Sequence, residues 1–462
     1  MSSTDIVKIW LKSTHGARYP PTPPPEHVIA PQRHMRKHKR KRAMSLPANA
    51  SGTTSHQCES PKRRRVDDAE DAELAQSASQ FGSENVLPLR DSNTFPPPTS
   101  RASSNLSRAR SPTRETPIIL KSASPPVLTE SLNGLQEPPP QHVEYLGDYL
   151  AAGVDLHFVP QGLKHIIKND SDVGHQITKP ADFNPVDLRS AEELAAIWRK
   201  VKTIFLNARD CKDGGRDENA WCDDVFRPLL GLAIQLYGKS RWWLQSVQSQ
   251  SIDPRYLSTV TARGPTDGRR KAIDRKTDYV LSYSHRHPAT SALYKQLGEA
   301  NMGDVGHTMD AFTRRTALFS GFEIKPASGD QTEAELQISI WSAASIRKKQ
   351  ELASLARLTI EPAAMVEPVF TIVGHEHHVY YCYPRDNLVS GRSGVHVLGP
   401  DLDRFERLST DSVRGIFRLL RLYGNVLAYG VDEEDDRYWG GVLGKTLTRL
   451  AGMSEFEADQ PG

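Results

Sequence analysis

Three side chains in two short apolar runs have the chemistry needed to hydrolyse a phosphodiester bond. Asp278 lies in the run 276–282, and Glu323 and Lys325 lie in the run 317–325. Because successive side chains of a strand point to opposite faces, Glu323 and Lys325 share one face. If Asp278 lies on the neighbouring strand, two carboxylates and a lysine converge. Such a set predicts hydrolysis assisted by a divalent ion, and hard oxygen ligands favour Mg²⁺ or Mn²⁺ over Zn²⁺.

Each of these residues has an expected role and a simpler explanation. Asp278 and Glu323 are expected to bind one metal ion or two. Lys325 is expected to orient or deprotonate a water molecule, or to neutralise charge on the phosphate. Glu218 offers a further ligand, directly or through water, but a glutamate in the first turn of a helix is equally explained by the helix dipole. The pair Glu323 and Lys325 alone is also typical of a solvated strand face, so the ordered set carries the prediction.

A histidine-rich segment, residues 375–378, is a second candidate for metal binding. His375 and His377 would share a strand face, yet no third ligand can be predicted for them. Two β-type runs, 368–373 and 379–383, flank the segment. We therefore expect a hairpin with this segment as its turn.

Basic residues also gather around the predicted strands. They include Arg286, Arg314 and Arg315, with His285 and His287 beside the first of them. Such side chains can contact DNA phosphates, and the alternative is an ordinary solvated surface.

The composition indicates a chain that is only partly folded. It has 462 residues, a formal net charge of +3, 37% hydrophobic residues and 32 prolines. The low hydrophobic share and the many prolines are explained if one part never folds. Four scattered cysteines suggest neither a disulfide scaffold nor a zinc site. No apolar run can cross a bilayer and no signal peptide is apparent, so we expect a soluble intracellular protein with no membrane partner.

The front of the chain, residues 1–140, is expected to be a disordered arm rich in Pro, Ser and basic residues. It holds two basic clusters, residues 33–42 and Lys62, Arg63, Arg64 and Arg65. Short exposed basic runs fit an importin groove, which predicts nuclear localisation, or a nucleic-acid backbone. The alternative is a solvated charge run without a specific role. An apolar stripe at residues 6–11 is either a transient helix or a docking peptide.

The rest of the chain predicts an α/β core with helices on the faces of a sheet. Helices are expected from residue 191, around 221–236 with a kink or break at Pro228, from residue 331, and over 411–429. Residues 283–315 are expected to be a long irregular insertion.

Over about residues 190–445 the chain resembles the PD-(D/E)XK nucleases, and in particular the fungal PD-(D/E)XK nuclease-like domain proteins. The segment 218–221 matches the first core helix, residues 260–262 and 276–279 match the first active-site strand, and residues 323–325 match the E-x-K strand. Residues 337–341 resemble the Q-h-x-x-Y helix, with Trp341 in place of tyrosine. The front also fits, through an I-x-x-W-L start and a K-R-R-R run. Thr277 replaces the proline that names the superfamily.

The resemblance implies a restriction-endonuclease-like fold, with a central mixed sheet flanked by helices, over residues 141–450. Residues 451–462 would be a flexible tail. It implies a metal-dependent nuclease that acts on DNA, or on RNA. Gln337 would position Lys325 or a phosphate, although a helix amide packed beside Trp341 is the simpler explanation. The alternative function is a catalytically inactive nuclease-like module that binds nucleic acid or protein in the nucleus.

Overall fold

The computed structural model describes residues 118–452, apart from residues 136, 175–177, 239, 262–269, 389–391 and 434–436. The basic clusters at 33–42 and 62–65, the apolar stripe at 6–11 and most of the predicted tail lie outside the described residues. Within them, no helix is long and apolar enough to cross a membrane.

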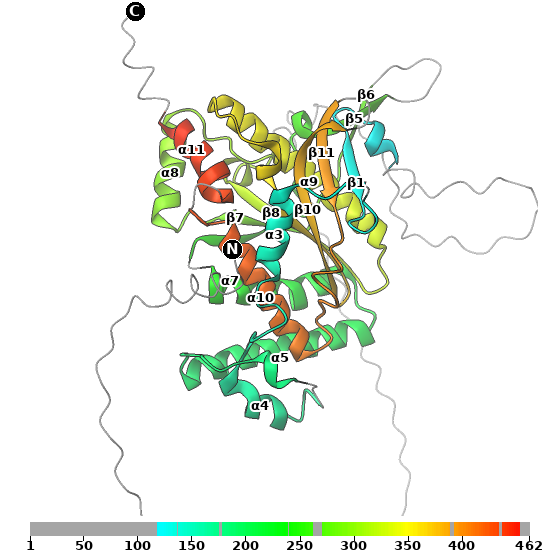
Figure 1. The fold of residues 1–462 in the computed structure, drawn as a ribbon, viewed down its shortest axis with the longest axis vertical. Helices are drawn as coiled ribbons and strands as arrows, with labels where there is room; N and C mark the ends of the chain where they lie inside the picture. Colours follow the sequence, from blue (N-terminus) through cyan, green and yellow to red (C-terminus); the bar gives the residue numbers. More distant parts are fainter. Residues whose placement is uncertain are drawn as a thin grey trace, which may run out of the picture. The chain divides into compact units, whose positions relative to one another are not determined.

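A seven-stranded mixed sheet forms the centre of the fold, in the order β1-β11-β10-β9-β8-β7-β4 (Figure 1). Its strands are β1 (Val127–Glu130), β4 (Trp242–Ser246), β7 (Tyr279–Tyr283), β8 (Leu318–Lys325), β9 (Glu367–Val373), β10 (Glu376–Leu388) and β11 (Arg392–Leu398). The pairs β8·β9 and β1·β11 are parallel, and the other neighbours are antiparallel. Two small sheets pair β2 (Val159–Pro160) with β3 (Phe183–Asn184), and β5 (Ser258–Thr261) with β6 (Arg270–Ile273).

Helices cover both faces of this sheet. They are α3 (Gln141–Ala151), α4 (Lys164–Asn169), α5 (Ala191–Asp213), α6 (Glu218–Ala220), α7 (Arg227–Tyr237), α8 (Pro288–Glu299), α9 (Gln331–Leu355), α10 (Val413–Tyr429) and α11 (Gly444–Ala451), with π-helical turns η3 (Trp221–Phe226) and η8 (Tyr438–Leu443). Helices α5, α7 and α10 pack side by side (Figure 1). They share one core with Phe322 and Phe370, whereas α9 shares the other core with Val280 and Val369.

A β-bulge in β8 decides which of these two cores each of its side chains meets. Val280 pairs with Gly321 and Leu281 pairs with Phe319, so Ser320 is the extra residue. Ser320 has a φ of 56°. Because a bulge reverses the alternation of side chains, Glu323 lies on the face opposite to Phe319, under α9. The bulge therefore turns Glu323 and Lys325 toward the α9 face.

Replacing Ser320 with glycine is expected to raise the free energy of unfolding by about 1 kcal/mol. Glycine adopts a positive φ without strain, and the Ser320 hydroxyl is buried without a hydrogen-bond partner. Denaturant unfolding measures the change. Ser320→Ala is the control, since it removes only the hydroxyl. A glycine variant that is no more stable than the alanine variant would contradict the strain argument.

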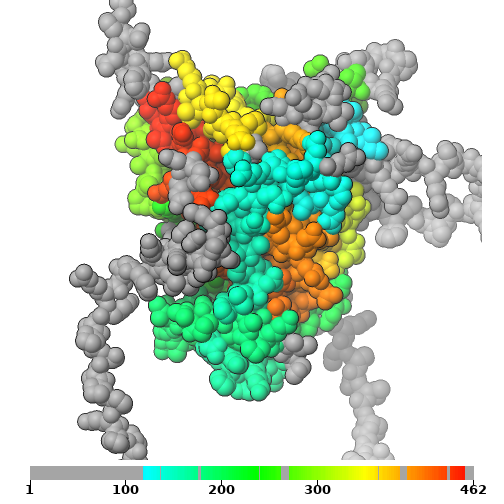
Figure 2. Space-filling view, viewed as in Figure 1, coloured from blue at the N-terminus to red at the C-terminus, as the bar shows by residue number. Residues whose placement is uncertain are grey.

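Regular structure is present before residue 141, the expected start of the folded domain. Residues Val127–Glu130 form β1, which pairs in parallel with Val395–Leu398 of β11 at one edge of the central sheet. Helix α3 then begins at Gln141. Figure 2 shows this part of the chain, in cyan and teal, spread over one face beside the orange residues of the later sequence. The ordered domain thus begins before residue 141.

The structure corrects or refines four further sequence predictions. The segment 283–315 contains the regular helix α8, with Pro288 in its first turn. The strand next to the active-site pair is β4, because residues 260 and 261 belong to β5 of a separate sheet. Of the kink and the break predicted at Pro228, the break is wrong, since η3 runs directly into α7, whose first turn holds the proline. The predicted hairpin is confirmed, but its turn is only Gly374 and His375, and residues 376–378 begin β10.

Candidate metal centre

Three carboxylates converge where strands β7 and β8 run beside the start of α6. One oxygen each of Glu218, Asp278 and Glu323 can be chosen so that all lie within 4.8 Å of one another. Glu323 and Asp278 are buried, with exposed fractions of 1% and 5%. This spacing suits a shared divalent cation, whose oxygen ligands lie at about 2.0–2.6 Å.

Lys325 lies inside this cluster and contacts two of the carboxylates. Its Nζ is 2.7 Å from Glu323 Oε1 and 3.0 Å from Glu218 Oε2. Burial lowers the pKa of this ammonium, but the two carboxylates outweigh burial and raise it above its ordinary value. Lys325 is therefore positively charged here.

Asp278 is held from two sides. Its Oδ2 accepts from the backbone N–H of Ile324 at 2.7 Å, and its Oδ1 accepts from Gln248 Nε2 at 2.9 Å. Burial raises the pKa of Asp278 to about 6, although both hydrogen bonds act in the opposite direction. The carboxyl therefore changes charge near pH 6.

Glu323 has one oxygen with nothing to bind. Its Oε2 is buried and accepts no hydrogen bond, while Oε1 contacts Lys325. Burial and then the charge of Asp278 raise the pKa of Glu323 well above its ordinary value, against the effect of Lys325. When all four groups are ionised, three carboxylates and one ammonium leave two net negative charges. A divalent cation would neutralise both and would satisfy the orphaned oxygen, so the residues fit such an ion.

Local structure explains why these side chains meet. Tyr279 pairs with Phe322, which places Asp278 beside Glu323 on the α9 face of the sheet. Thr277, in place of the superfamily proline, donates from Oγ1 to the Phe322 carbonyl at 2.9 Å and extends this contact. Glu218 follows an N-cap aspartate in the first turn of α6. Its placement near the start of a helix agrees with the dipole explanation, and its contact with Lys325 also places it in the site.

Gln337 lies on α9, as expected, but its contact is with the backbone. Its Nε2 donates to the Lys276 carbonyl at 3.4 Å, and its Oε1 is buried without a partner. Lys276 is two residues before Asp278, so the hydrogen bond from Gln337 holds the segment that leads into β7. Its catalytic role stays a prediction.

The histidine segment does not form a metal site in the described part of the chain. There, Glu218, Asp278 and Glu323 are the group of three ligand-type residues that lies close enough for one ion. His377 shares a hydrogen bond of 2.6 Å between its Nδ1 and the Tyr423 hydroxyl, within the core. His375 instead contacts Trp221, with ring centroids 5.2 Å apart.

Sequence reasoning missed Gln248. It lies two residues past the end of β4, and the Val247 N–H donates to the Asp278 carbonyl at 2.9 Å. The signal available was an edge strand, residues 242–246, rich in aromatic residues. Its pairing with β7 brings the following glutamine to Asp278.

Adjacent strands of the mixed sheet thus carry an aspartate and an E-x-K segment, with a helix glutamate beside them, and this group could hold a metal ion. The PD-(D/E)XK nuclease superfamily model matches residues 167–439, more than half of the chain. The chain therefore belongs to the PD-(D/E)XK nuclease superfamily. No curated protein gives a significant match.

Proposed function

We propose that this protein is a metal-dependent nuclease that hydrolyses DNA phosphodiester bonds, with RNA as the second substrate to test. The observation that carries the proposal is the cluster of Glu218, Asp278 and Glu323 around Lys325, in a chain of the nuclease superfamily. A buried carboxylate oxygen without a partner and two surplus negative charges support a divalent cation there.

Each side chain of the cluster has a proposed role. Asp278 and Glu323, with Glu218 directly or through water, would hold Mg²⁺ or Mn²⁺. When bound, the ion lowers the pKa of a water molecule and stabilises charge on the phosphate. The two neighbouring carboxylates keep Lys325 protonated. A protonated amine cannot act as a base, so Lys325 is assigned the role of orienting water and neutralising developing charge.

The test is cleavage by the full chain. We expect nicking of supercoiled plasmid with Mg²⁺ or Mn²⁺ and no nicking with EDTA. Single-stranded, duplex and flapped oligonucleotides of DNA and RNA give the substrate class. An intact substrate under every condition would overturn the nuclease and favour the inactive nucleic-acid-binding or protein-interaction module.

Replacing Gln248 with alanine is expected to weaken Mn²⁺ binding about 10-fold or more, because groups that orient a ligand carboxylate affect metal affinity by about 10–100-fold. Calorimetric titration of Mn²⁺ measures the change. Gln245→Ala is the matched control, since Gln245 donates to Ser282 Oγ, at 3.1 Å, instead of to Asp278. Equal affinity of the two variants would remove the positioning role of Gln248.

We further propose that the protein enters the nucleus through an importin that binds Lys62, Arg63, Arg64 and Arg65. Changing these four residues to alanine is expected to leave a fluorescently tagged chain in the cytoplasm, as imaging would show. The same change at Arg199, Lys200, Arg209 and Lys212 of α5 is the charge-matched control. An unchanged nuclear signal in the first variant would remove the import proposal. From the resemblance of its sequence, we also propose that the protein is one of the fungal PD-(D/E)XK nuclease-like domain proteins.

A further inference from the structure

An exposed group of aromatic and basic side chains lies at the β4 edge of the central sheet. We call Trp243, Phe312, Arg286, His285 and Arg315 the edge patch. Trp243 and Phe312 are 38% and 42% exposed, although large aromatic residues are usually buried. Their ring centroids are 5.9 Å apart. Segments from three places in the sequence thus meet in one solvent-facing cluster.

A guanidinium and an imidazole contact these rings. The guanidinium of Arg286 lies over the ring of Trp243, 4.9 Å from its centroid, and the ring of His285 is 4.9 Å from that of Phe312. Arg315 is exposed, three residues after Phe312. Among the described residues, neither Arg286 nor Arg315 has a carboxylate within 4.0 Å. Their positive charge is therefore not neutralised by a neighbouring side chain.

The edge patch and the metal centre lie on the same face of the sheet. Trp243 pairs directly with Ser282, and directly paired residues share a face. Ser282 is four residues from Asp278, an even number, so both point to the same side. Val280, between them, packs in the α9 core.

The two sites are also joined by one strand. Gln248, which contacts Asp278, lies five residues after Trp243, or at most roughly 17 Å along the chain. A polymer that enters the metal centre from this edge of the sheet would pass the edge patch. The site and the patch therefore fit one extended ligand.

We propose that the edge patch binds an unpaired stretch of nucleic acid that leads to the metal centre, with bases stacked on Trp243 and Phe312 and phosphates held by Arg286 and Arg315. Aromatic rings beside uncompensated cations are the usual means of binding a single strand, because every base has a stacking face and every linkage a charge. The inference rests on the proposed function only in one respect, namely that the bound nucleic-acid strand leads toward the metal centre. It names single-stranded or tailed nucleic acid as the substrate class.

The experiment measures the binding of short fluorescent oligonucleotides to the full chain by anisotropy, in EDTA so that no cleavage occurs. We expect single-stranded DNA or RNA, and duplex with a single-stranded tail, to bind more tightly than blunt duplex. Trp243→Ala is expected to weaken binding of the single strand roughly tenfold, and Trp243→Phe to restore most of it. Binding of blunt duplex should not respond to either change.

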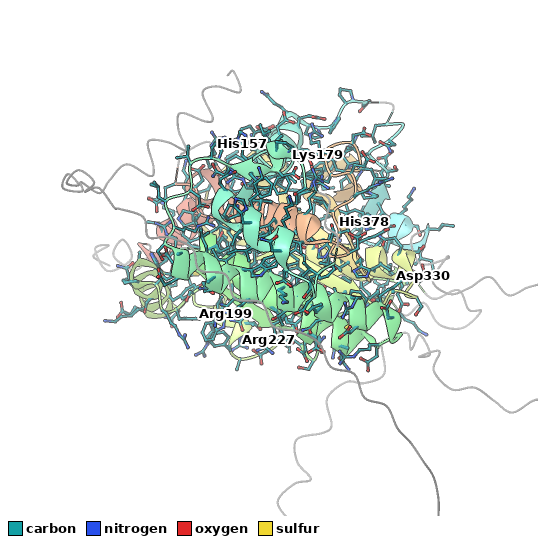
Figure 3. The ribbon with its side chains drawn as sticks, turned by 90° about the horizontal axis from the view of Figure 1, so that it is seen from below. His157, Lys179, Arg199, Arg227, Asp330 and His378 are labelled. Atoms are coloured by element: carbon teal, nitrogen blue, oxygen red, sulfur yellow. The ribbon has the colours of Figure 1, made fainter. Side chains whose placement is uncertain are left out.

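The arginines have their own readout and control. Arg286→Ala is expected to lower the dependence of binding on salt by about one released counterion. Arg199→Ala removes the same charge from the exposed outer side of α5 (Figure 3), which contributes nothing to the edge patch, and is expected to have no effect. Equal effects of both variants would reduce the patch to general electrostatic attraction and overturn the proposal.

Two other results would also overturn it. One is tight binding of the single strand that Trp243→Ala leaves unchanged. The other is a chain that binds no nucleic acid but forms dimers in light scattering that Trp243→Ala dissociates, since the patch would then be a protein interface. Failure of catalysis is separable, because binding is measured in EDTA and does not depend on cleavage. Binding through Trp243 without cleavage would retain the patch and reject the nuclease.

Discussion

Replacement of Lys325 with alanine is expected to lower the rate of phosphodiester cleavage by about 10²–10⁴-fold. The ammonium contacts Glu323 and Glu218 at 2.7 and 3.0 Å, and it is the positive side chain of the carboxylate cluster. Its loss removes the group that orients water or neutralises charge on the phosphate. Single-turnover cleavage of a labelled oligonucleotide measures the effect, with Mg²⁺ present.

The same change has a cost in stability that must be separated from catalysis. Glu323 is buried, and removal of the partner of a buried charge costs about 3–5 kcal/mol. A bound divalent ion would offset part of this cost. Denaturant unfolding and circular dichroism, both with Mg²⁺, show whether the variant is folded in the assay.

Lys349 provides a matched control. It is as buried as Lys325 and contacts Glu367, a buried glutamate of β9, and Ser345 of its own helix. Lys349→Ala should destabilise the protein in the same way without an effect on cleavage by the molecules that remain folded. If a folded Lys325→Ala variant cleaves at the wild-type rate, Lys325 has no part in the chemistry.

The relation between site residues on the same strand, or on two strands that follow each other in the site, could be predicted from the sequence. The alternation of residues 322–325 places Glu323 and Lys325 on one face whatever precedes them. The prediction that Asp278 lies on the neighbouring strand needed only two apolar runs, which the structure pairs as β7 and β8. The bulge at Ser320 leaves this relation intact, because it lies before both residues of the pair.

The features that the sequence did not predict depend on contacts between segments far apart in the chain. Which core Glu323 faces is set by the bulge, and serine at a positive φ gives no reliable sequence signal. Strand β1 is short and lies in a proline-rich context, and it forms through parallel pairing with β11 far along the chain. Gln248 is an ordinary polar residue until β4 pairs with β7. Helix α8 differs from these features, because its start could have been predicted: proline in a first turn is a signal for the start of a helix.

Replacement of Asp278 with asparagine is expected to stabilise the metal-free protein at pH 7.5 by on the order of 1–3 kcal/mol. Burial raises the pKa of Asp278 to about 6, from an ordinary value of 3.8. The folded state therefore binds this proton more tightly than the unfolded state. Stability falls as pH rises from about 4 to 6, and above this window the folded protein carries a buried charge that asparagine lacks.

The effect has a pH dependence and a metal dependence that denaturant unfolding can resolve. In EDTA, the gain from Asp278→Asn should shrink at pH 5, because Asp278 is then mostly protonated in the folded wild type. With Mg²⁺ or Mn²⁺ the order should reverse: the wild type gains stability by mass action, and the variant, which lacks a ligand charge, gains little. This reversal links the raised pKa to metal binding, since the cation and the proton compete for the same carboxylate.

Asp253 gives a control of the opposite sign. Burial acts to raise its pKa, but the hydrogen bonds from Arg255 outweigh burial and lower it. Asp253→Asn should therefore destabilise the protein at pH 7.5 and leave its response to Mn²⁺ unchanged. If Asp278→Asn also destabilises in EDTA and keeps the full response to Mn²⁺, then Asp278 is a structural carboxylate, and the acid cluster does not bind metal through it.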